Sequence, residues 1–199
     1  MCTKCMIKVA VIAAVTAVSS TQVGHATGTG TAAQDAMAAE ARTLVKGFAG
    51  KLKHALVSSI KADGPVSAIG VCNISAPEIA SEQSKATGWK IGRTSTKLRN
   101  SHNAPDAWEA KVLAMFAEKK AAGGDLKPMQ FYETVEVEGK KTFRYMKAIP
   151  VGKPCLTCHG EKLKPALSAK LQELYPQDAA TGFKLGDLRG AFTLSKPLN

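Results

Sequence analysis

Three side chains with metal-ligating and thioether chemistry stand together in the second half of the chain. Cys155, Cys158 and His159 occur in the run Cys155-Leu156-Thr157-Cys158-His159-Gly160. Two cysteines separated by two residues, with a histidine directly after the second, are typical of a c-type haem attachment site. This spacing lets both thiols reach the two vinyl groups of one porphyrin, and it places His159 beneath the iron as an axial ligand. The motif therefore predicts one covalently attached haem c.

Two other chemistries use similar residues. A closed zinc centre takes four thiolate and imidazole ligands, and Cys72, Cys155, Cys158 and His159 form a permissible set. A thioredoxin-like dithiol site also has two cysteines at this spacing, but it needs a βαβ context that is missing here. Haem attachment is therefore the interpretation that we carry forward.

The opposite face of the iron needs its own ligand. By residue type the candidates are one cysteine, two histidines and four methionines: Cys72, His54, His102, Met37, Met115, Met129 and Met146. Methionine raises the potential of the iron, histidine lowers it, and a cysteine thiolate lowers it further because it places an anion on the metal. Cys72 is the thiol left over after the two thioethers form, yet a buried cysteine also serves as a small hydrophobe. Residue chemistry leaves the second axial ligand open.

The N-terminus indicates export. Lys4 and Lys8 precede an apolar run over residues 9–18, and Gly24-His25-Ala26 supplies the small residues that signal peptidase reads. We expect a secretory signal peptide over 1–26, a flexible lead-in over 27–34 and one domain over 35–199 in the periplasm. No later run is long and apolar enough to cross a bilayer. Haem c is attached outside the cytoplasm, so the signal agrees with the haem motif.

The charge balance is strongly basic. Lys and Arg number 27 against 16 Asp and Glu, and loss of Lys4 and Lys8 with the signal lowers the formal charge from +11 to +9. A basic protein can bind nucleic acid, an anionic membrane surface or an acidic partner. Export argues against nucleic acid, and the scattered lysines favour a solvated basic surface.

Patterns along the chain predict the elements that must position these residues. Apolar residues recur at intervals of three and four in the first helix, which Asp63-Gly64-Pro65 ends, and Pro77 favours a kink or break after Ala76 in the second. The expected helices occupy residues 34–61, 66–86, 107–122 and 165–175. The expected strands occupy residues 89–95, 129–137, 142–151 and 190–196. The middle two strands form a hairpin, and the haem motif follows them in a loop.

This order of elements predicts an α+β fold. The sheet is antiparallel and flanked by helices on one side, and a long helix comes first. A doubly wound fold would need alternating strands and helices, and an all-helical cytochrome c would not contain the hairpin.

Several short motifs occur along the chain: Ala68–Asn73, Ala76–Ala80, Ile91–Ser95, Leu98–Asn100, Asn103–Glu109, Cys155–Gly160, Tyr175-Pro176 and Gly186–Ala191. Together they are similar to a family of exported single-haem c-type proteins with a PAS-like haem domain. The family was long catalogued as a domain of unknown function, and it occurs alone or as the periplasmic input module of membrane sensor kinases. The similarity covers about residues 35–197. Ser101-His102 departs from the family, which often has proline and alanine there, and it puts a titratable group in that loop.

The resemblance implies a fold and a ligand set. The fold is a PAS-like sheet, the haem is covalently attached to Cys155 and Cys158, and the axial ligands are His159 and Cys72. From the residues themselves, Arg93 and Arg99 are candidates for binding the haem propionates, because a guanidinium captures a carboxylate with two parallel hydrogen bonds. The alternative is that both arginines pair with surface carboxylates.

The functional expectation is a periplasmic haem protein in redox or electron-transfer service, acting with a redox partner protein. The alternative is a redox or gas (NO or CO) sensor that acts through a separate partner. An enzyme such as a peroxidase is disfavoured, because a six-coordinate iron has no open position and no general acid–base pair is evident.

Overall fold

The structure is a computed structural model that describes residues 31–198. The predicted signal peptide over 1–26 and residues 27–30 of the lead-in over 27–34 lie outside the described residues. No helix within residues 31–198 is long and apolar enough to span a membrane.

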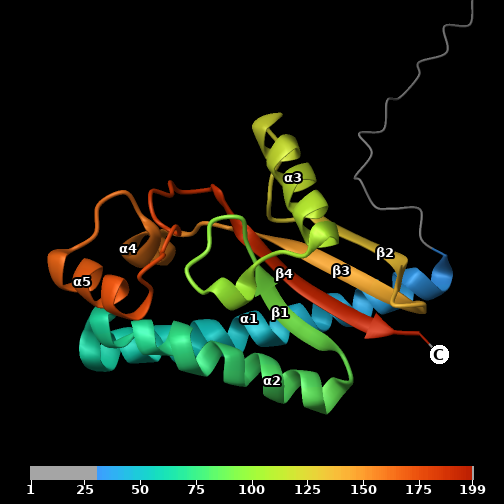
Figure 1. Ribbon diagram of the computed structural model, residues 1–199, viewed down its shortest axis with the longest axis horizontal. Coiled ribbons are helices and arrows are strands. Elements are labelled where there is room, and N and C mark those ends of the chain that lie inside the picture. The colour runs from blue at the N-terminus through green and yellow to red at the C-terminus, as the bar shows by residue number, and fades with distance from the viewer. Residues whose placement is uncertain (1–30, 199) are drawn as a thin grey trace, which may run out of the picture.

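Four antiparallel strands form one sheet in the order β1-β4-β3-β2 (Figure 1). Their bounds are β1 (Lys90–Thr94), β2 (Gln130–Val137), β3 (Lys140–Pro150) and β4 (Leu188–Pro197). The predicted hairpin is β2–β3, closed by Glu138-Gly139 with positive φ angles of 50° and 74°. Two positive φ angles at the turn are what a tight hairpin with strongly twisted strands requires. The last strand, β4, lies between β1 and β3.

The chain before the sheet is helical. α1 (Ala32–Ser67) begins with a capping box in which Thr31 and Gln34 satisfy each other's backbone N–H groups. Gly64 breaks the helical backbone with φ 82° and ψ 177°, and Pro65 starts the next turn. The predicted stop at residues 63–65 is therefore a sharp kink, after which helical structure resumes at once.

Cys72 lies on an irregular turn of the second helical stretch. The chain forms a π-helical turn, η1 (Val71–Ser75), before α2 (Ala76–Thr87), and the N–H of Ala76 donates to the Val71 carbonyl five residues back. The break predicted after Ala76 falls one turn earlier. Pro77 has no N–H and its ring crowds the carbonyl four residues before it, so the wider turn accommodates it.

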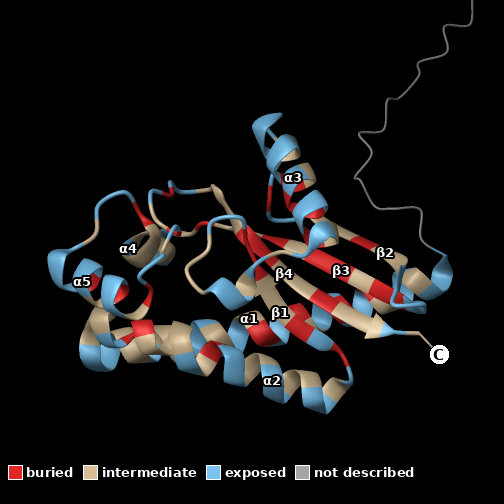
Figure 2. Cartoon of the chain, viewed as in Figure 1, coloured by how far each residue is buried: buried red, intermediate tan, exposed pale blue. Residues whose placement is uncertain are grey.

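Helices cover both faces of the sheet, and the prediction that they lie on one side is wrong. α1 packs Val45 and Phe48 against a core that includes Phe143 of β3. α3 (Ala107–Ala121) packs Phe116 against Met146 on the opposite face. Figure 2 shows β3 and β4 buried along their middle. The physical reason is that β3 is apolar at successive positions, so both of its faces need cover. The α+β fold with a long first helix is confirmed.

The haem motif is helical, although the sequence predicted a loop. A single 3-10 turn, η3 (Lys153–Cys155), leads into α4 (Leu156–His159), and α5 (Pro165–Leu174) follows. α5 packs Leu167 and Leu171 against Ile69, just before the π turn. This contact brings the segment after the motif against the segment that carries Cys72.

Candidate functional site

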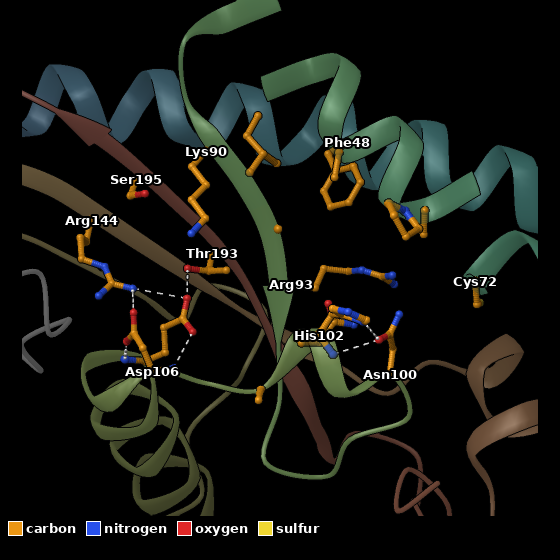
Figure 3. A pocket seen from close by; sticks show the side chains of 18 of the residues that line it. Phe48, Cys72, Lys90, Arg93, Asn100, His102, Asp106, Arg144, Thr193 and Ser195 are labelled. Atoms are coloured by element: carbon orange, nitrogen blue, oxygen red, sulfur yellow. Dashed lines mark hydrogen bonds and ion pairs between the residues drawn. The ribbon is translucent and has the colours of Figure 1, made fainter. Parts of the chain in front are cut away.

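A cavity of about 720 Å³ opens along β1, the edge strand of the sheet. It lies between α2, α3 and the 3-10 turn η2 (Ser101–Asn103), as Figure 3 shows. Its volume falls within the roughly 300–1,000 Å³ of small-molecule and cofactor sites. Cys72, Arg93 and His102 are in its wall, whereas Cys155, Cys158 and His159 are not.

The cavity separates the candidates for the second axial ligand. Of the seven side chains that the sequence offered, only Cys72 and His102 line it. His54 is exposed, and the four methionines belong to the two cores that pack on the sheet. His102 is exposed and its Nδ1 lies 3.0 Å from Oδ1 of Asn100. Cys72 is half-buried on the π turn and carries a free thiol.

Arg93 extends from β1 into the cavity, on the side where Cys72 lies (Figure 3). Burial lowers its pKa, and the opposing charges of Cys72 and Tyr175 raise it again. No hydrogen bond or ion pair to its side chain is found within residues 31–198. Arg93 is half-buried, so its guanidinium is partly desolvated, and an anion in the cavity would compensate its charge.

His159 is held in the tautomer that a metal ligand needs. Its Nδ1 lies 2.7 Å from the Ala180 carbonyl, which can only accept, so the proton is on Nδ1 and Nε2 has a free lone pair. Burial lowers the pKa of His159 to about 3, and Arg189 and Arg99 contribute in the same direction. The ring is therefore neutral at ordinary pH.

Backbone contacts also fix the motif. The N–H of Phe183 donates to the His159 carbonyl and that of Gly182 to the Gly160 carbonyl, both at 3.0 Å. Gly160 itself has no room for a side chain, because a Cβ there would lie 2.5 Å from the Leu156 carbonyl oxygen. The last residue of the motif is therefore glycine for steric reasons.

Arg99 lies behind the motif and outside the cavity wall. Its Nε donates to Asp178 at 3.0 Å, and its Nη2 donates to the carbonyls of Cys158 at 2.6 Å and Ala180 at 3.3 Å. These groups are committed to protein acceptors. The geometry thus favours Arg93 over Arg99 for binding a propionate. Arg99 pairs with a buried carboxylate, that of Asp178, whereas Arg93 pairs with none within residues 31–198.

The three cysteines share one electrostatic neighbourhood. Burial raises the pKa of Cys158, Arg99 lowers it, and Cys72 and Cys155 raise it further. The charge of Cys72 thus reaches Cys158 although the two are far apart in sequence. Within residues 31–198, no group of three or more His, Cys, Asp or Glu side chains is arranged to hold a metal ion. The zinc alternative therefore has no preformed ligand set.

Sequence reasoning missed Arg189 and the loop that holds His159. Arg189 donates to Ser95 Oγ at 2.9 Å and lies 5.4 Å from the centre of the Phe183 ring. Burial lowers its pKa to about 10, helped by Arg99 and Arg93. Phe183 packs edge-on against His159 at 6.2 Å. Arg189 stood in a quoted motif without a role, while Ala180 acts through its backbone and left no sequence signal.

The chain is similar to known proteins in sequence and in fold. A family model described as Tll0287-like matches residues 10–197 of the chain. Among solved structures, the crystal structure of the cyanobacterial heme-protein Tll0287 is similar, with 26% sequence identity and a TM-score of 0.63. That match covers 81% of this chain and 94% of the other. No curated protein matches the chain.

Proposed function

The chain belongs to the Tll0287-like family, and from that premise we propose that it binds one haem, attached covalently through Cys155 and Cys158. The observation that carries the proposal is the state of His159. It directly follows the second cysteine, its Nδ1–H donates to the Ala180 carbonyl, and its Nε2 lone pair is left for a metal. The similarity to a protein described as a heme-protein supports the same conclusion.

The residues on the other side fit the rest of such a group. Cys72 is the proposed second axial ligand, since it is a half-buried free thiol that lines the cavity. Arg93 is the proposed propionate partner, since it is a partly desolvated cation in the same cavity wall. Haem supplies one-electron redox chemistry, and a thiolate ligand holds its potential low.

The proposed role is electron transfer in the periplasm with a redox partner protein. Sensing of redox state or of a gas such as NO is the second candidate, and one observation favours it. Cys72 lies on a π turn between the kink at Gly64 and α2. Such turns are frequent at functional sites. Loss of a bond between Cys72 and the iron would release this turn and could shift the adjoining ends of α1 and α2.

The ligand proposal is tested by spectra and potentiometry of the haem-loaded chain. Cys72→Ala should shift the Soret band and raise the midpoint potential, because an anion leaves the iron. His102→Ala is the matched control, since it removes the other cavity-lining candidate and should change neither. An unchanged spectrum in Cys72→Ala would refute the assignment. Covalent attachment is checked by the mass of the denatured chain, which should fall by the mass of the haem when Cys155→Ala and Cys158→Ala are combined in one chain.

Substitution of Arg93 should change the thermal stability of the haem-free and haem-loaded chains in opposite directions. Arg93→Met should raise the thermal stability of the haem-free chain slightly, because it removes a half-buried cation that has no partner within residues 31–198. If Arg93 binds a propionate, the same variant should lower the stability of the haem-loaded chain, because the propionate would lose its partner. Lys90→Met, at an exposed position of the cavity wall, serves as control and should shift neither form in this way. Equal shifts in both forms would exclude the propionate role.

The two roles differ in how the reduced protein responds to NO. A sensor binds NO rapidly with loss of the thiolate signature, whereas a carrier keeps its spectrum and is reoxidised by a protein partner.

A further inference from the structure

A buried ion pair stands directly behind the haem motif. Arg99 and Asp178 meet at 2.9 Å, and their side chains are 7% and 8% exposed. Neither residue lines the cavity. A pair this deep costs desolvation energy on both sides and is weak evidence for stability alone. What it contacts is therefore more informative than the pair itself.

The pair connects three separate segments of the chain. Arg99 donates to the Cys158 carbonyl in the motif and to the Ala180 carbonyl, while Asp178 accepts from Arg99 and from the Ala180 N–H at 2.8 Å. A backbone bond of 2.7 Å from Ala179 to the Leu98 carbonyl runs beside it. The ion pair thus contacts both backbone groups of Ala180: Asp178 accepts from its N–H, and Arg99 donates to the carbonyl that orients His159.

The Ala180 carbonyl accepts two donors at once. His159 Nδ1 donates at 2.7 Å and the Arg99 guanidinium at 3.3 Å. A carbonyl that also faces a cation is a weaker acceptor for the imidazole N–H. The Nδ1–H bond then stays less polarised, and the imidazole donates less electron density from Nε2.

We propose that Arg99 and Asp178 are positioning residues for His159. The pair fixes the ring's tautomer and orientation before any haem is attached, and the charge of Arg99 limits how strongly His159 donates to the iron. The proposal rests on the proposed function for its second half and on the chain alone for its first.

Opposite charges predict opposite effects on the midpoint potential of the haem-loaded protein. Arg99→Met removes a cation and frees the Ala180 carbonyl to pull harder on Nδ1–H, so the potential falls. Asp178→Asn keeps an oxygen for the Ala180 N–H but leaves the charge of Arg99 uncompensated, so the potential rises. A pair that only stabilises the fold would destabilise the protein in both variants without this difference in sign.

Three further variants sharpen the test. Arg99→Lys keeps the charge and loses the planar fork, so it should retain more of the wild-type potential than Arg99→Met. Arg42→Met removes the same charge from an exposed position of α1, where Arg42 donates to Gln130 of β2, and should leave the potential unchanged. Arg99→Met with Asp178→Asn in one chain should lower the potential as Arg99→Met does, because Asp178→Asn acts through the charge of Arg99, which that chain lacks.

The haem-free chain provides a readout that does not depend on the cofactor. Nitrogen-15 NMR of the ring should show Nδ1–H as the single slowly exchanging tautomer of His159 in the wild type. Faster exchange or a mixture of tautomers is expected in Arg99→Met and Asp178→Asn, but not in Arg42→Met.

Potentials that shift in the same direction in both variants, or a His159 tautomer that neither variant changes, would overturn the proposal. If the wild-type chain takes up no covalent haem under c-type maturation, the proposed function fails, and the NMR result still decides the positioning role.

Discussion

The depressed pKa of His159 predicts how acid affects the haem-free chain. The group titrates at about 3 in the folded protein against an ordinary 6.5, so the unfolded chain takes up the proton first. The free energy of unfolding therefore falls as pH falls from about 6.5 toward 3, and this group has little effect above pH 7. Each pH unit in that window costs about 1.4 kcal/mol. At pH 4.5 the loss is roughly 2.7 kcal/mol.

Urea unfolding at pH 7 and pH 4.5 measures this loss. His159→Asn is the control, because its amide can donate to the Ala180 carbonyl from near the position of Nδ1 and carries no titrating group. The other titratable groups are the same in both proteins, so the difference between the pH dependences of the wild type and the variant isolates His159. The wild type should lose about 2–3 kcal/mol more than the variant. PH dependences equal within about 0.5 kcal/mol would refute the buried, neutral state of His159.

Three substitutions test the scaffold. Gly190 has φ 153°, and a Cβ there would lie 2.3 Å from the Thr94 carbonyl oxygen, so Gly190→Ala should cost at least about 2 kcal/mol in urea unfolding. Gly70→Ala, helical and with open space around the new Cβ, should instead gain about 0.5–1 kcal/mol; similar effects at both sites would contradict the packing of β1 on β4. Asp106→Ala removes the cap of α3 and a 2.7 Å pair with Arg144, and it should lower the unfolding free energy by about 1–2 kcal/mol. A loss below about 0.3 kcal/mol would show that the cap does not form.

Local features were predictable from the sequence because neighbouring residues determine them. α3 begins at the predicted residue 107, directly after its cap Asp106, and the Glu138-Gly139 turn closes the predicted hairpin. The kink at Gly64-Pro65 follows from the φ that glycine allows and the N–H that proline lacks. The spacing of the haem motif likewise pointed to His159 without any knowledge of the fold.

Features that depend on long-range packing were not predictable in this way. Nothing near Arg99 in the sequence indicates that its acceptors are Asp178 and the carbonyls of Cys158 and Ala180. The π turn at Cys72 was also not predicted. Pro77 determines that one backbone hydrogen bond is lost, but tertiary packing determines where the helix adjusts to that loss. The candidate residues could therefore be chosen from the sequence, but only tertiary contacts show that Arg93 lines the cavity and that Arg99 bonds to protein acceptors.

The position of β4 has a consequence for how the protein folds. β4 is the last strand in the sequence, yet it pairs with β1 on one edge and with β3 on the other. β1 leads from the helical segment with Cys72, and β3 leads into the motif with His159. The two halves of the sheet thus share no ladder until residues 188–197 are in place. Such non-local closure slows folding, and it leaves the two sides of the candidate site separate until the final strand docks.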